Sequence, residues 1–210
     1  MNMTKEIAEE VGIHIGDGSM NIYKNIPTYT VACNSVSDRE FITNTVASLI
    51  RKIYKIEPKP KNWSKGSFGF RIYSKKLVEF KTVIGLPLGK KTNIAMPNLI
   101  LGNKEFALAC IRGIFDTDGY VYIENKYGKT YPRLEIATTS EKLAEQIKTI
   151  LQEEDINCSV WINNRRNINW KPKFTISVRG YKNLKKWMET IGTDNSRNKN
   201  KIHALYRRTL

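Results

Sequence analysis

Several residue types that mark whole classes of protein are scarce in this chain of 210 residues. It has three cysteines and two histidines, and no two cysteines have CxxC spacing, which argues against a structural zinc site or a disulfide framework. No run approaches the roughly 18 apolar residues that a membrane-spanning helix needs. The first ten residues also lack the apolar stretch of a secretory signal. We therefore expect a cytoplasmic protein with free thiols and no membrane partner.

Acidic residues are outnumbered by basic ones. Lys and Arg total 35 and Asp and Glu total 20, which gives a formal net charge of +15. Hydrophobic residues make up 40% of the chain, enough to build a core rather than a disordered chain. A charge excess of this size predicts a polyanionic partner, because a small acidic metabolite would not require it.

The chain contains an internal repeat of about half its length. Residues 7–18 and 108–119 are both rich in small and apolar residues, and both end in Asp-Gly. Each has a glycine five residues before its final acid, Gly12 before Asp17 and Gly113 before Asp118. A repeat on this scale predicts two similar halves within one chain.

The same succession of predicted elements follows each motif: two extended stretches, a helix, two extended stretches and a helix. In the first half these are residues 19–23, 28–33, 38–54, 55–58, 67–73 and 75–84, and in the second half 120–124, 133–138, 141–153, 158–162, 173–178 and 182–191. Ser37 and Glu40 have the spacing of a capping box at the first of these helices. We predict an α/β protein of the α+β kind. Its two pseudo-symmetric αββαββα halves, residues 1–101 and 102–210, would each contain a four-stranded antiparallel sheet.

The first helix of each half has a chemical consequence. Small residues and glycine let two helices approach closely, which would bring Asp17 and Asp118 together at the ends of the pair. An acid is unfavourable at a helix C-terminus, and two carboxylates repel each other unless a divalent cation lies between them. Hard oxygen ligands suit Mg²⁺. The pattern therefore indicates metal-dependent cleavage of a phosphodiester.

These residues resemble a known motif. The segment 111–119, IRGIFDTDG, is similar to the LAGLIDADG motif of homing endonucleases, and 11–18, VGIHIGDG, resembles a more degenerate copy with Ile15 in place of the first acid. The segment 85–92, GLPLGKKT, followed by Ala95-Met96-Pro97, is similar to the linker that precedes the second motif in archaeal-type members. The resemblance covers nearly the whole chain and indicates a double-motif member of this family.

The resemblance implies a monomer that cuts double-stranded DNA at a long, specific site, uses Mg²⁺ (with Mn²⁺ as a substitute) and leaves four-nucleotide 3′ overhangs. It implies that Asp17 and Asp118 bind metal, with help from the backbone carbonyls of Gly16 and Thr117. It also implies a basic residue near each scissile phosphate. Our candidates are Lys90 or Lys91 in the first half and, among Arg197, Lys199 and Lys201 in the second half, Lys199.

Alternation along the strands predicts one apolar and one polar face on each sheet. The polar faces would form a saddle that fits the major groove of DNA. The residues that we expect to contact DNA lie on these faces and in the adjoining loops: Lys24, Thr28, Thr30, Arg71, Tyr73, Lys126, Arg133, Arg165, Arg166, Lys173, Thr175 and Ser177. We interpret His14 as a packing residue, the tryptophans as core or sheet-edge residues, and the basic tail 197–208 as a solvated helix.

Two other functions fit the same composition. An RNA maturase or a non-cleaving DNA-binding regulator could share this fold, and a basic ribosome-associated protein would also carry a large positive charge. The acids retained in both motifs favour the enzyme, and a ribosome-associated protein has no reason to repeat Asp-Gly at mid-chain.

Overall fold

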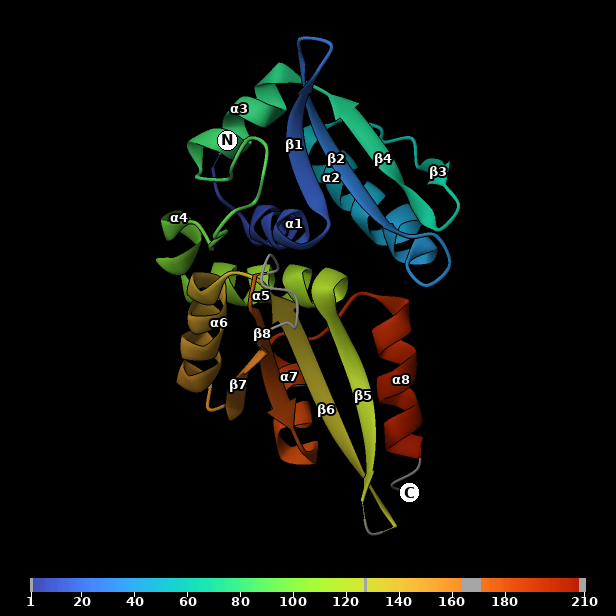
Figure 1. The fold of residues 1–210 in the computed structure, drawn as a ribbon, viewed down its shortest axis with the longest axis vertical. Helices are drawn as coiled ribbons and strands as arrows, with labels where there is room; N and C mark the ends of the chain where they lie inside the picture. The colour runs from blue at the N-terminus through green and yellow to red at the C-terminus, as the bar shows by residue number, and fades with distance from the viewer. Residues whose placement is uncertain (1, 127, 164–170, 208–210) are drawn as a thin grey trace.

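The structure is a computed structural model that describes residues 2–126, 128–163 and 171–207. Its two halves lie one above the other, with helices α1 and α5 side by side at the waist (Figure 1). The first half consists of α1 (Lys5–Gly16), β1 (Gly18–Tyr23), β2 (Ile26–Asn34), the π-helix η1 (Phe41–Val46), α2 (Ala47–Tyr54), β3 (Lys61–Ser64), β4 (Ser67–Tyr73) and α3 (Lys75–Val83).

The second half repeats this order. It consists of α5 (Lys104–Asp118), β5 (Gly119–Lys126), β6 (Lys129–Thr138), α6 (Glu141–Glu153), β7 (Cys158–Asn163), β8 (Lys173–Arg179) and α7 (Tyr181–Thr190). The short helix α4 (Asn98–Leu101) lies in the linker, and α8 (Ser196–Arg207) follows the second half. The predicted αββαββα repeat and α+β class are confirmed.

Each half contains one four-stranded antiparallel sheet, in the order β1-β2-β4-β3 in the first and β5-β6-β8-β7 in the second. The predicted apolar faces form the core, where these side chains are buried: Tyr29, Val31, Phe68, Phe70, Ile72, Leu134, Ile136, Phe174, Ile176 and Val178. Figure 1 shows α2 behind the upper sheet and α7 behind the lower one. The opposite face of each sheet carries the polar residues, and none of the helices among the described residues packs over it in Figure 1.

The two halves meet through glycines on α1 and α5. A Cβ atom at Gly12 would lie 2.1 Å from the carbonyl oxygen of Cys110, and one at Gly113 would lie 2.1 Å from that of Glu9. Each helix therefore presents bare backbone to the backbone of the other, in a symmetric pair of contacts. Only glycine allows an approach this close. The predicted tight helix pair is confirmed.

Gly113→Ala is expected to destabilise the protein by about 1–3 kcal/mol, because a methyl group at this position overpacks a rigid backbone contact. The matched control is Gly102→Ala, where the added Cβ would lie at an ordinary 3.5 Å from the carbonyl oxygen of Asn98. Urea unfolding of both variants checks the prediction. Equal effects of the two substitutions would contradict it.

One predicted strand is misplaced. Residues 55–58 form no strand, and the edge strand is β3, three residues after that range. Lys55 adopts a left-handed conformation with φ of +56° and ends α2. Pro58 and Pro60 also lack the N–H that a strand would donate to the sheet, so pairing begins only at Lys61.

The predicted capping box does not form. The hydroxyl of Ser37 donates to the carboxylate of Asp38 at 2.6 Å. The side chain of Asn34 instead accepts from the backbone N–H groups of Val36 at 2.9 Å and Ser37 at 3.1 Å. A π-helix then precedes α2, so this helix begins differently from its counterpart α6. There Ser140 is the N-cap and its side chain accepts from the N–H of Leu143.

Several smaller expectations concern single residues. Cys33 and Cys110 are buried free thiols, while Cys158 is half-buried. His14 is fully buried and stacks on Tyr29, with ring centroids 5.3 Å apart, which confirms a packing role. The tail is more than a solvated helix, because α8 buries Ile202 and Leu205 in the core. Among the described residues, no helix combines the length and apolarity needed to cross a bilayer.

Candidate metal centre and nucleic-acid interface

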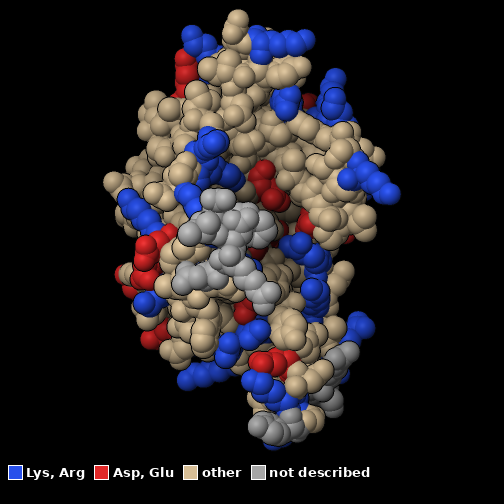
Figure 2. All heavy atoms as spheres, viewed as in Figure 1, with Lys and Arg blue, Asp and Glu red and all other residues tan. Residues whose placement is uncertain are grey.

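The C-terminal ends of α1 and α5 bring two acids together at the waist. Asp17 is the C-cap residue of α1, and Asp118 is the last residue of α5. A Cβ atom at Gly16 would meet the Thr117 side chain at 2.0 Å and a carboxylate oxygen of Asp118 at 3.4 Å. Asp118 thus lies beside the end of α1, where Asp17 is the next residue. Figure 2 shows acidic side chains at the waist, with Lys and Arg above and below.

The electrostatics of this pair favour a cation. Burial, and then repulsion from Asp118, raise the pKa of Asp17 to about 7. Asp118 has an exposed surface, but partial desolvation by the surrounding protein raises its pKa and Lys91 opposes that rise. Within the part of the chain that the structure describes, neither carboxylate has a hydrogen-bond or ion-pair partner. Two unpaired carboxylates with raised pKa values fit a hard divalent cation such as Mg²⁺.

Asp17→Asn is expected to stabilise the metal-free protein more at pH 8 than at pH 4. The unfolded chain ionises Asp17 near pH 3.8, whereas the folded protein retains the proton up to about pH 7, so stability falls as the pH rises between these values. The loss is at most about 4 kcal/mol, and about 2 kcal/mol once hydration of the half-buried carboxyl is considered. Thermal unfolding at both pH values checks this, and a pH-independent effect would contradict it.

A lysine from the linker lies at the end of α1. The Nζ of Lys91 donates to the carbonyl oxygens of His14 at 3.3 Å, Ile15 at 2.8 Å and Gly16. A cation is favoured there because these carbonyls end the helix dipole. Burial lowers the pKa of Lys91, and the charges of Asp118 and Asp17 oppose that shift. The other candidate of this half, Lys90, is exposed and makes no such contact.

In the second half the positions of the three candidate cations favour Arg197. Lys199 pairs with Asp194 at 2.9 Å, and Lys201 donates to the carbonyl of Val121 at 3.3 Å. Arg197 is the residue near the acids: it donates to the carbonyl of Gly119 at 3.0 Å, and its charge lowers the pKa of Asp17. Spacing along the chain could not separate these three residues, because all lie within one and a half turns of α8.

A second acidic cluster lies nearby, but its charges are already paired. Ligand atoms of Glu9, Asp116 and Asp194 lie within 4.8 Å of one another. Glu9 pairs with Arg112, and Asp116 accepts from the hydroxyl of Thr193 and from the N–H of Asp194 at 2.8 Å. Asp194 pairs with Lys199. Because these acids already have partners, this cluster has less unpaired negative charge for a metal ion to neutralise than Asp17 and Asp118 have.

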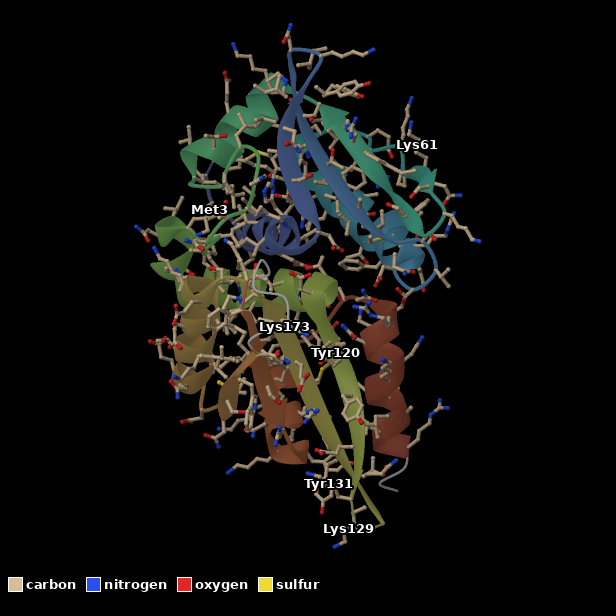
Figure 3. The ribbon with its side chains drawn as sticks, viewed as in Figure 1. Met3, Lys61, Tyr120, Lys129, Tyr131 and Lys173 are labelled. Carbon is tan, nitrogen blue, oxygen red and sulfur yellow. The ribbon has the colours of Figure 1, made fainter. Side chains whose placement is uncertain are left out.

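A cavity of about 220 Å³ opens beside Asp118. It is lined from both halves, with Gly16 and Lys91 on one side and residues from β6, β8 and the end of α5 on the other, namely Asp118, Thr138, Thr139 and Lys173. Figure 3 shows Lys173 near the waist, where β8 begins, and Lys129 at the far tip of the β5–β6 hairpin. Lys173 therefore lies closer to the metal candidate than to the end of the saddle.

The polar face of the first sheet holds an arginine in a fixed position. Arg71 donates to the hydroxyl of Thr30 at 3.2 Å. Its guanidinium lies 5.1 Å from the ring centroid of Tyr23 and 4.7 Å from that of Trp63. Cation–π contacts of this kind restrain the side chain. Nearby, Tyr73 is 55% exposed and Lys24 lies in the β1–β2 turn with φ of +50°.

The second sheet repeats the combination of arginine and aromatic residues. Arg133 pairs with Glu135 at 2.9 Å and lies 5.0 Å from the ring centroid of Tyr122. Arg179 is directly opposite Arg133 in the strand register and lies 5.7 Å from the ring centroid of Trp161. Trp161 is 56% exposed, so it belongs to the polar face rather than to the core. Thr175 lines a shallow depression together with Arg133, Trp161 and Arg179.

Some of the predicted contact residues are poorly placed. Thr28 and Ser177 are 2% and 1% exposed. The hydroxyl of Thr28 donates to the carbonyl of Asn21 and that of Ser177 accepts from Arg179, so we leave both out of the proposed contact set. Lys126 is paired with Glu124 at 2.9 Å. Arg165, Arg166 and Trp170 lie outside the described residues.

Sequence reasoning missed several residues of this site: Asp38, Arg179, Asn195 and the aromatic partners of the arginines. Arg179 had a usable signal, because it continues the alternation of β8 past Ser177 by one polar position. Asp38 and Asn195 had none, since each acts through a contact about 160 residues away along the chain.

Comparison with known proteins extends this description. The family described as LAGLIDADG-like domain matches residues 105–192. The fold is similar to that of I-DmoI in complex with DNA and Mn, with a TM-score of 0.64 and 19% identity, covering 91% of this chain and 98% of that one. It is also similar to I-SmaMI bound to an uncleaved DNA target in the presence of calcium ions, with a TM-score of 0.63 and 12% identity, covering 99% and 93%.

Two curated proteins of Methanocaldococcus jannaschii are similar in sequence. One is the ATP-dependent DNA helicase Hel308, which is 25% identical over 205 residues, covering 93% of this chain and 16% of the helicase. The other is an isomerizing glutamine–fructose-6-phosphate aminotransferase, which is 22% identical over 204 residues, covering 96% and 17%. The chain thus spans about a sixth of the length of these relatives.

Proposed function

We propose that the protein is a site-specific double-stranded DNA endonuclease of the homing type. Residues 105–192 match the LAGLIDADG-like domain family, and the chain as a whole has the fold of the homing endonuclease I-DmoI. The observation that carries the proposal is the pair of unpartnered acids, Asp17 and Asp118, at the meeting point of two helices. The arginine-bearing faces of the two sheets lie on either side of this point.

The residues at the waist have separate roles in this proposal. Asp17 and Asp118 would hold Mg²⁺, or Mn²⁺ in its place, and the ion would supply Lewis-acid chemistry at the scissile phosphate. The carbonyls of Gly16 and Thr117 remain proposed additional ligands, and the first of them currently accepts from Lys91. Lys91 and Arg197 offset the charge that develops on the phosphates. Both strands would be cut, leaving four-nucleotide 3′ overhangs.

The two sheets would read the DNA. Arginine can bond guanine through two donors, and lysine mainly neutralises phosphate. The proposed contact residues that remain available are Lys24, Thr30, Arg71, Tyr73, Lys126, Arg133, Lys173 and Thr175, to which the structure adds Arg179. Because one chain carries both acids and both sheets, the protein would act as a monomer, and we propose that it does so in the cytoplasm.

The two curated relatives indicate that a segment of this kind occurs within different host proteins. A helicase and an aminotransferase share no chemistry, yet each contains a stretch of about 200 residues similar to this chain. Because the chain matches only 16% and 17% of these relatives, their names do not describe what this chain does. A DNA endonuclease of the homing type accounts for the same segment occurring in unrelated proteins.

Cleavage of a randomised duplex library in the presence of Mg²⁺ tests the proposal. We expect a narrow set of sequences to be cut on both strands with four-nucleotide 3′ overhangs. Selective binding to duplexes without cleavage would favour a regulator. Binding to structured RNA without DNA cleavage would favour a maturase.

Arg71→Ala is expected to relax the preference for one base pair, at a cost of about 1–3 kcal/mol for the preferred sequence. The control is Lys61→Ala on the exposed edge strand β3 (Figure 3). It should weaken binding to all duplexes alike and reduce the salt slope by about one. Competition binding with single-base variants of the selected site measures both. A uniform loss with Arg71→Ala would contradict a reading role.

A further inference from the structure

An acid of the first half reaches into the second half next to the candidate metal centre. Asp38, between β2 and η1, has a side chain that is only 9% exposed. Its carboxylate accepts from the side-chain amide of Asn195 at 2.8 Å and lies 3.1 Å from a guanidinium nitrogen of Arg197. Buried ion pairs of this kind fix geometry because each partner needs the other.

The guanidinium of Arg197 is held at two points. One terminal nitrogen contacts Asp38, and the other donates to the carbonyl of Gly119, the residue after Asp118. The remaining donor, Nε, is buried and has no partner within the described part of the chain. Arg197 therefore spans the end of α5 and the first half, with one donor unused.

The charge of Arg197 acts on one acid of the pair. Lys91, and then Arg197, lower the pKa of Asp17, whereas Lys91 alone of the two lowers the pKa of Asp118. A cation from the second half thus serves the acid of the first half. The contact that sets its position comes from Asp38.

We propose that Asp38 is a positioning residue that holds Arg197 at the end of α5, on the carbonyl of the residue after Asp118, so that cutting of one DNA strand depends on this contact between the halves. The inference rests on the proposed endonuclease function and deepens it. Within the described residues the carboxylate of Asp38 makes no hydrogen bond or ion pair to Asp17 or Asp118, and it bonds to Asn195 and Arg197. Any effect of Asp38 on the position of a cation would therefore pass through Arg197, although its charge also acts on Asp17 directly.

Among the described residues, the second half has no equivalent contact. Ser140 is at the position of Asp38, because the carbonyl oxygen of each accepts from the backbone N–H four residues later, and a serine has no charge to hold an arginine. The next residue, Glu141, is exposed. The hydroxyl of Ser140 donates to the carbonyl of Ile94 at 2.6 Å, and Lys91 is held by backbone carbonyls of α1 rather than by a carboxylate. Loss of the Asp38 carboxylate should therefore affect one of the two strands.

Asp38→Asn tests the proposal, because it keeps the size of the side chain and an acceptor for Asn195 but removes the charge that holds Arg197. The substrate is a supercoiled plasmid carrying the duplex selected by the wild-type protein, and a linear copy with each strand labelled. We expect one strand to be cut at least about tenfold more slowly, the other at the wild-type rate, and nicked circles to accumulate. Glu141→Gln is the matched control and should leave both rates unchanged.

Arg197→Lys provides a second route that does not depend on the folding of the Asp38 variant. Lysine keeps the charge but cannot span both contacts, so the same strand should be slowed. Equal slowing of both strands, slowing of opposite strands by the two variants, or no change in either would overturn the proposal. A wild-type protein that leaves every duplex intact would instead refute the proposed function, and the inference with it.

Discussion

Asp17→Asn and Asp118→Asn are each expected to reduce cleavage about a thousandfold or more while leaving duplex binding intact. Cations held between the two carboxylates contribute several kcal/mol to phosphodiester hydrolysis, and about 4 kcal/mol corresponds to a factor of a thousand. Each substitution removes one anionic ligand and keeps the shape of the side chain. Binding should not weaken, because an acid near the phosphates repels them.

The measurement is cleavage of the selected duplex with Mg²⁺, together with its dissociation constant in Ca²⁺. Asp155→Asn is the control, since Asp155 is exposed, lies far from the waist in the turn after α6, and pairs only with Lys186 at the surface. It should cut at the wild-type rate. Full cleavage by either waist variant would exclude these acids as the metal site.

Lys81→Met is expected to destabilise the protein by about 3–5 kcal/mol, the cost of leaving a buried charge without its partner. The Nζ of Lys81 contacts both carboxylate oxygens of Glu10, at 2.8 and 2.6 Å, and both side chains are completely buried. The hydroxyl of Tyr54 also donates to Glu10 at 2.8 Å. Removal of the lysine leaves Glu10 with one neutral donor.

The pseudo-symmetry of the chain supplies a rescue variant. Met188 on α7 corresponds to Lys81, and Ile111 on α5 corresponds to Glu10, so the second half has apolar side chains at both positions. Glu10→Ile combined with Lys81→Met should recover most of the lost stability, apart from the cost of leaving the Tyr54 hydroxyl without its acceptor. Urea unfolding measures both variants. A double variant no more stable than Lys81→Met would contradict this account of the pair.

The elements that the sequence predicts well are those specified by local patterns. The strands 67–73 and 173–178 alternate cleanly between apolar and polar residues, and the structure has β4 and β8 at these positions with at most one residue of difference. Gly85 and Gly192, after the closing helices, have φ of +103° and +72°. Short-range spacing is sufficient for such features, because it reports which side of an element is buried.

The errors arise where a local pattern competes with a tertiary contact. Ser37 and Glu40 have capping-box spacing, but the carboxylate of Asp38 accepts hydrogen bonds from Asn195 and Arg197 of the other half. The helix then begins after a different turn. Similarly, the basic composition of the tail suggested a solvated helix, whereas α8 docks through Ile202 and Leu205. The spacing of residues along the chain gives no information about contacts between residues that are so far apart in the sequence.

The candidate site shows the same division. The positions of Asp17, Asp118 and Lys91 follow from the motif repeat and the linker, which fix where each helix ends. Selection of Arg197 over Lys199 depends on which side chain is already neutralised by Asp194. That information exists only in three dimensions.

We propose that the ends of α1 and α5 form a shared metal site over a DNA backbone. The most direct measurement is anomalous diffraction from crystals of the protein with its selected duplex, soaked in Mn²⁺. We predict manganese peaks between the carboxylates of Asp17 and Asp118. Peaks confined to the cluster of Glu9, Asp116 and Asp194, or no peak at the waist, would contradict the claim.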